Sequence, residues 1–126
     1  MIIAIILDES SSMNTIKDST ISGFNEFIDE RKNDLTQSDK TLKRFIKITF
    51  NSVVRSDEYT HIDEVSLLND SNYFPANATA LYDAIGKGFE VIGDNKEDEV
   101  WFIIITDGLE NRSQTHNIQS IKKYIK

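Results

Sequence analysis

Two short apolar runs constrain the fold of this chain more than any other feature. The first is Met1–Leu7, which is rich in isoleucine and stops at Asp8; the second is Val100–Thr106, which stops at Asp107. β-Branched residues favour strands. Strands that are apolar on both faces are typical of parallel sheets covered by helices on each side. The two runs therefore predict two buried, parallel strands of an α/β sheet.

The segment between these strands carries helical and hairpin patterns. Residues 19–32 and 80–92 each place their apolar side chains in one stripe at helical spacing, which predicts two amphipathic helices. Residues 45–50 alternate between apolar and polar side chains, and a turn candidate at Asn51-Ser52 follows. Together with residues 53–61 they predict an antiparallel hairpin.

Polar loops and a last helix complete the predicted order. We expect loops at residues 33–40 and 67–78, and a C-terminal amphipathic helix where Ile118 and later isoleucines recur at helical spacing. The order strand, helix, hairpin, loop, helix, strand, helix predicts an α/β layer fold with a mostly parallel sheet and one antiparallel edge strand. The length of 126 residues and the lack of a linker predict a single domain, residues 1–126.

Composition excludes several kinds of site and partner. The chain has no cysteine, which excludes disulfides, thiolate catalysis and cysteine-based zinc sites. A formal net charge of −7 argues against binding along a nucleic-acid backbone. No apolar run has the length of a membrane span or of a signal-peptide core with its flanks. We therefore expect a cytoplasmic protein (in the host cytoplasm if viral) that binds neither nucleic acid nor membranes.

Each apolar strand is followed directly by an aspartate. Functional side chains gather at the carboxyl ends of the strands in open α/β sheets, so Asp8 and Asp107 should face each other if their strands are neighbours. Two carboxylates that close repel unless a proton or a cation lies between them. Ser10, Ser12 and Thr79 add hydroxyl groups nearby. An all-oxygen set with few carboxylates predicts Mg²⁺ or Mn²⁺.

Three segments resemble motifs of von Willebrand factor A (VWA) domains. Asp8-Glu9-Ser10-Ser11-Ser12 is similar to the D-x-S-x-S motif, and Thr79–Ile85 is similar to the T-A-L-Y-D-A-I segment. Thr106–Asn111 resembles the T-D-G-x-x-N segment of bacterial and bacteriophage members. The motifs occur in family order, and the resemblance covers nearly the whole chain. It implies a three-layer, Rossmann-like fold with a metal-ion-dependent adhesion site.

The resemblance also implies a role for each site residue. Ser10 and Ser12 would be direct hydroxyl ligands of the metal, and Thr79 would join them in the ligand-bound form. Asp8 and Asp107 would bind directly or through water and orient the hydroxyls. In this family the metal usually joins the domain to an aspartate or glutamate of a partner protein, and it performs no reaction. Apart from the resemblance, we expect the rim and surroundings of the site to include Glu9, itself expected at the surface, and Ser11, Tyr73, Asn77, Tyr82, Asp83, Gly108 and Asn111.

The match ends earlier than the family pattern does. VWA domains usually continue with one or two more strands and a helix after the segment that corresponds to residues 117–126. We therefore expect strand 100–106 to form an edge of the sheet. An apolar edge invites pairing, so Trp101, Phe102 and Ile104 would contact a second copy of the chain, another partner, or a rearranged C-terminal segment.

Other functions fit the same residues less well. A phosphatase of the haloacid dehalogenase type also places an aspartate after its first strand, but it needs a second acidic residue two positions later, where this chain has Ser10. No glycine-rich phosphate loop follows the first strand. We therefore expect no enzymatic activity. The main alternative to a cation-dependent interaction module is a metal-independent structural or oligomerisation subunit with a vestigial site.

Overall fold

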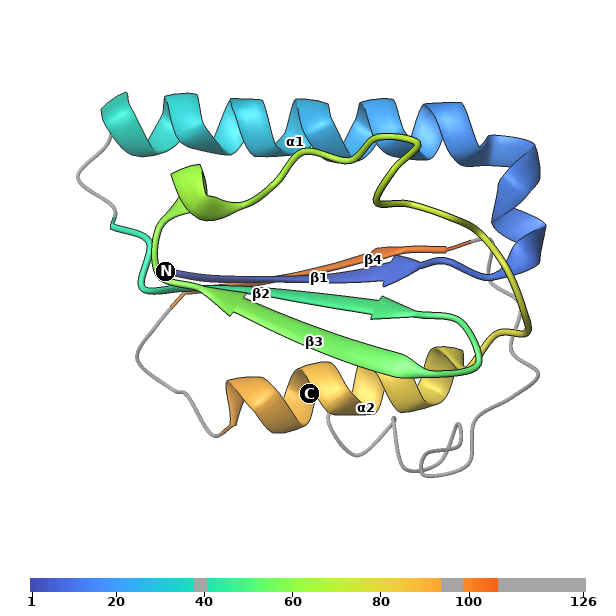
Figure 1. The fold of residues 1–126 in the computed structure, drawn as a ribbon. Helices are drawn as coiled ribbons and strands as arrows, with labels where there is room; N and C mark the ends of the chain where they lie inside the picture. Colours follow the sequence, from blue (N-terminus) through green and yellow to red (C-terminus); the bar gives the residue numbers. More distant parts are fainter. Residues whose placement is uncertain (38–40, 94–98, 107–126) are drawn as a thin grey trace.

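The computed structural model describes residues 1–37, 41–93 and 99–106, which form an α/β sandwich of three layers. Figure 1 shows the long helix α1 on one side of the sheet and α2 on the other. Along the chain the elements are β1 (Ile2–Asp8), the 3-10 helix η1 (Ser11–Ile16), α1 (Lys17–Gln37), β2 (Arg44–Phe50), β3 (Val54–Tyr59), the 3-10 helix η2 (Ile62–Glu64), α2 (Leu81–Ile92) and β4 (Val100–Ile105).

The sheet has the strand order β3-β2-β1-β4, with β1 in its interior. β1 runs parallel to both β2 and β4, whereas β3 pairs antiparallel with β2. The predicted Rossmann-like arrangement, a mostly parallel sheet with one antiparallel edge strand, is therefore confirmed. The antiparallel pair is the predicted hairpin, in which Phe50 lies opposite Val54.

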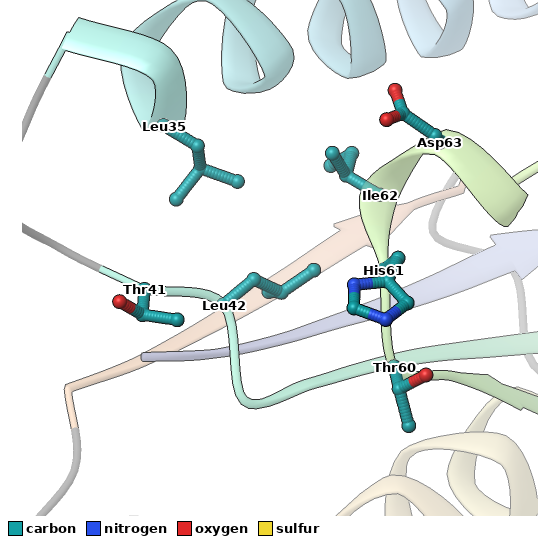
Figure 2. A pocket seen from close by; sticks show the side chains of 7 residues that line it. All are labelled: Leu35, Thr41, Leu42, Thr60, His61, Ile62 and Asp63. Carbon is teal, nitrogen blue, oxygen red and sulfur yellow. The ribbon is translucent and has the colours of Figure 1, made fainter.

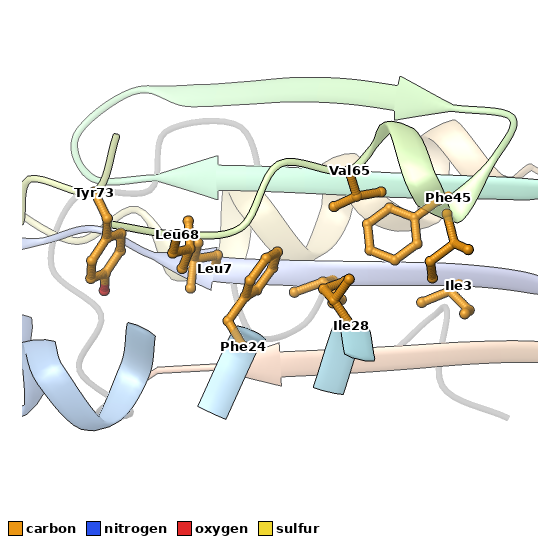
Figure 3. Close-up of a cluster of buried hydrophobic side chains, with 10 residues drawn as sticks. Ile3, Leu7, Phe24, Ile28, Phe45, Val65, Leu68 and Tyr73 are labelled. Atoms are coloured by element: carbon orange, nitrogen blue, oxygen red, sulfur yellow. The ribbon is translucent and has the colours of Figure 1, made fainter. Parts of the chain in front are cut away.

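The residues of β1 divide between two hydrophobic cores because successive side chains point to opposite faces of a sheet. Ile3, Ile5 and Leu7 pack with Phe24 and other residues under α1. Figure 3 shows this cluster, with Tyr73 at one end and Phe45 at the other. The alternate residues of β1, beginning with Ile2, pack under α2. The two-sided burial explains why the strand has no polar residue before Asp8.

Helix α2 approaches the sheet most closely at Gly88. A Cβ atom built on this residue would lie 2.9 Å from Ile6 Cδ1 and from the Phe102 ring. That ring also stacks on Phe89, with ring centroids 4.5 Å apart, which restricts its movement. Glycine at position 88 therefore permits the contact between α2 and the sheet.

The structure corrects the predicted end of one helix and the predicted exposure of one loop. Helix α1 continues to Gln37, so the predicted loop 33–40 starts too early. The segment 67–78 is irregular as expected, but it is not a surface loop throughout, because Leu68 and Tyr73 are buried. The predicted helix around Ile118 lies outside the described residues. Neither of the described helices combines the length and apolar character needed to cross a membrane.

Strand β4 forms an edge of the described part of the sheet, as expected for residues 100–106. Its side chains are less buried than those of β1, and Ile104 is 41% exposed. Trp101 is half-buried beneath the Arg31 guanidinium, which lies 4.6 Å from the ring centroid, and it packs against the core under α1. Pairing of this edge with a second copy stays a prediction.

Exchange of two glycines for alanine should change stability in opposite directions. Gly88→Ala should lower the free energy of unfolding by about 1–2 kcal/mol, because the added methyl group overpacks a fixed contact. Gly23→Ala is the matched control on α1, where a Cβ would meet nothing within 4 Å. It should raise the free energy of unfolding by about 0.5–1 kcal/mol. Urea denaturation of both variants measures these changes in the free energy of unfolding. Equal changes in the two variants would contradict the close approach of α2 to the sheet.

The ion pair between Arg44 and Glu58 should make stability depend on pH. Arg44 donates two hydrogen bonds of 3.1 and 2.6 Å to this carboxylate, which lowers the pKa of Glu58. A lowered carboxyl pKa stabilises the fold above the unfolded-state pKa, and the contribution disappears as pH falls through the folded-state pKa. Glu58→Gln should therefore cost about 0.5 kcal/mol at neutral pH, as is usual for exposed pairs. Urea denaturation at a series of pH values should show this cost disappearing below about pH 4. A difference in unfolding free energy between parent and variant that stays constant with pH would contradict the prediction.

Candidate functional site

The candidate site lies where β1 ends and the chain turns into η1. Asp8 is the last residue of the strand, and Ser10 precedes the 3-10 helix in extended conformation. Both residues are buried, with 0% and 1% of their surface exposed. Buried polar groups need hydrogen-bond partners, and these two supply one for each other.

The Asp8 carboxylate organises this turn. Its Oδ1 accepts hydrogen bonds from the Ser10 backbone N–H at 2.8 Å and from the Ser10 hydroxyl at 2.6 Å. Its Oδ2 accepts a hydrogen bond of 2.7 Å from the hydroxyl of Thr106, which directly follows β4. The parallel pairing of β1 with β4 brings Thr106 to this position. Within the described residues all these donors are uncharged, so the carboxylate has no cationic partner there.

The serine hydroxyls of the motif lie close to each other. Ser10 Oγ and Ser12 Oγ are 3.3 Å apart, and Ser12 is half-buried. Adjacent oxygen ligands of an octahedral Mg²⁺ ion lie about 3 Å apart, so this spacing fits a shared cation. The described residues contain no group of three His, Cys, Asp or Glu side chains that could hold a metal. A site built from one carboxylate and several hydroxyls would not form such a group.

The segment 73–80 is distant from the serine motif in the sequence but lies beside it in the structure. The Asn77 carbonyl accepts a hydrogen bond of 3.0 Å from the Ser11 backbone N–H, and Asn77 has a φ of 68°, which asparagine tolerates better than most residues. The Ala78 N–H donates to Ser52 Oγ at 3.1 Å. Thr79, the next residue, is buried with 3% of its surface exposed. The structure thus brings the segment that bears Thr79 against the serine motif.

Glu9 corrects the sequence prediction, because it is not a surface residue. It is 5% exposed, and its carboxylate accepts hydrogen bonds from the Arg55 guanidinium and from the Phe74 backbone N–H. Arg55 itself is 61% exposed on the β2–β3 hairpin. Sequence reasoning missed Arg55, since an arginine on an edge strand is ordinarily a solvated side chain.

Tyr73 also lies deeper in the structure than we predicted. We expected it at the site rim, but it is fully buried, and its hydroxyl donates a hydrogen bond to the backbone carbonyl of Asp8. Aromatic character alone does not identify this anchor, because the next residue, Phe74, is 62% exposed. Of the other residues predicted at the rim, Asp83 lies in the first turn of α2 and Ser11 is exposed in η1. The expected site residues Asp107, Gly108 and Asn111 lie outside the described residues.

A pocket lies at the opposite end of the sheet from the candidate site, around η2. Figure 2 shows it between Leu35 of α1 and the residues around η2. His61 directly precedes η2, and its backbone N–H donates to Glu64 Oε1 at 3.0 Å. This hydrogen bond lowers the pKa of Glu64. The polar groups of His61 and Glu64 therefore cap a helix end.

Neither the known family models nor the curated proteins match this chain. Its similarity to VWA domains therefore rests on the three motifs and stays a prediction.

Loss of the Tyr73 hydroxyl should destabilise the site end of the fold. Tyr73→Phe removes the donor and leaves a buried carbonyl of Asp8 without it, which should cost about 1–2 kcal/mol of unfolding free energy. Tyr59→Phe is the control, because Tyr59 pairs with Phe45 at the opposite end of the sheet. Urea denaturation should show the larger loss for Tyr73→Phe. Equal losses would argue that the hydroxyl does not anchor Asp8.

Proposed function

We propose that this chain is a VWA-like module that binds a protein partner through a divalent cation and catalyses no reaction. The single observation that carries the proposal is the cluster formed by the buried residues Asp8 and Ser10 with the half-buried Ser12. It joins a carboxylate to two hydroxyl oxygens 3.3 Å apart, at the carboxyl end of the central strand. This is the usual location of ligand sites in open α/β sheets.

The donor chemistry favours Mg²⁺ or Mn²⁺, since every available ligand atom is a hard oxygen. Ser10 and Ser12 would hold the cation through their hydroxyl oxygens, while Asp8 fixes the orientation of the Ser10 hydroxyl through its hydrogen bond of 2.6 Å. Thr79 and Asp107 are the further ligands that the motifs propose. The cation would supply positive charge beside the buried Asp8 carboxylate, and a partner aspartate or glutamate would bind to it.

A thermal-unfolding titration with Mg²⁺ and Mn²⁺ tests the metal site. Binding at one hundred times the dissociation constant adds about 2.7 kcal/mol to the free energy of unfolding. This should raise the melting temperature of the parent chain by several degrees. Ser12→Ala should weaken the affinity by about tenfold or more, since even indirect partners of metal ligands contribute that much. Asp8→Asn should abolish the shift because it removes the negative charge next to the Ser10 and Ser12 hydroxyls.

The matched control is Ser11→Ala, which removes a serine hydroxyl from the exposed position between Ser10 and Ser12. It should retain the affinity of the parent. If millimolar Mg²⁺ and Mn²⁺ leave the melting temperature of the parent unchanged, the proposal is wrong and the metal-independent structural subunit becomes the better hypothesis. Equal weakening in the Ser11 and Ser12 variants would also overturn it.

A further inference from the structure

We infer that Glu9 is a positioning residue that locks the segment 73–80 against the serine motif and so fixes the ligand set of the proposed metal site. The inference rests on the proposed function, because it assigns Glu9 a role toward the cation. Glu9 is in the middle of the motif, between Asp8 and Ser10, but its carboxylate binds other partners.

Four hydrogen bonds connect Glu9 to two separate segments. Toward the β2–β3 hairpin, its backbone N–H donates to the Phe50 carbonyl at 2.6 Å, and its Oε1 accepts from Arg55. Toward the loop, its Oε2 accepts from the Phe74 N–H at 2.9 Å and its carbonyl accepts from the Ala76 N–H, also at 2.9 Å. One residue therefore joins the motif, the hairpin and the loop.

The neighbouring contacts show why this junction matters for the site. The Ser11 N–H donates to the Asn77 carbonyl at 3.0 Å, and Asn14 Nδ2 donates to the Pro75 carbonyl at 3.1 Å, so two further hydrogen bonds join the loop to the motif and to η1. Thr79 lies two residues beyond Asn77. A shift of the loop at Phe74 would therefore be transmitted to the position of Thr79 relative to Ser10 and Ser12.

The charge of Glu9 makes the junction strong. The carboxylate is buried and accepts from a cationic guanidinium, and hydrogen bonds between charged groups are roughly twice as strong as neutral ones. The partners of the carboxylate are the hairpin and the site loop, which is the pattern expected of a residue that positions ligands.

Glu9→Gln tests the inference, with Glu58→Gln as the matched control. Both substitutions neutralise a carboxylate that binds an arginine of the same hairpin, but Glu58 is bound to Arg44 at the opposite end of the sheet. Isothermal titration with Mg²⁺ on the full chain should show an affinity weakened by about tenfold or more for Glu9→Gln. Glu58→Gln should leave the affinity unchanged. Arg55→Gln should weaken the affinity as well, and Arg55→Lys should recover part of the loss.

A second measurement examines the junction without metal. Hydrogen exchange of the Phe74 and Ala76 amides should be faster in Glu9→Gln than in the parent and unchanged in Glu58→Gln. If Glu9→Gln does not fold, the exposed Arg55→Gln and Arg55→Lys pair gives the same comparison.

The outcomes separate the inference from the proposed function. If the parent does not bind Mg²⁺, the proposed function fails and the inference fails with it. If the parent binds Mg²⁺ and Glu9→Gln binds it equally well while melting at a lower temperature, Glu9 is merely structural and only the inference is wrong. The expected result is weaker binding together with faster exchange at Phe74 and Ala76.

Discussion

The hydrogen bonds of the Asp8 carboxylate are the constraint on which the site end of the molecule depends. β1 is buried on both faces, so the chain can become polar only where the strand ends. Asp8 takes that first polar position while still fully buried. Burying a carboxylate is unfavourable unless its oxygens are hydrogen-bonded. Ser10 and Thr106 supply those bonds, and they thereby join the start of η1 to the end of β4.

Much of this arrangement was predictable because it follows from local patterns. Apolar runs such as 1–7 and 100–106 can be covered on both faces only between two layers of helices, and this predicted the layers of the fold. Once the two strands were adjacent, Asp8 and the residues after β4 had to meet at one edge. Ser10 and Ser12 follow Asp8 within one turn of chain, so their proximity needed no long-range information.

The contacts that were missed are long-range and polar, or continue a pattern beyond its clearest part. Arg55, Glu9 and Tyr73 look like surface residues in the sequence, and only the tertiary fold brings them together at the motif. The end of α1 was placed too early because the residues after 32 are mostly polar. Leu35, seven positions after Ile28, continues the apolar stripe and was the available signal.

The distribution of charge partners distinguishes the candidate site from the rest of the fold. Glu58 and Glu9 each bind an arginine, as carboxylates that serve stability commonly do. Asp8 is more deeply buried than either, yet within the described residues it is held by uncharged donors alone. A buried charge without a counter-charge lowers stability. A cation bound at Ser10 and Ser12, as we propose, would remove that cost, so the same burial that weakens the metal-free fold would strengthen metal binding.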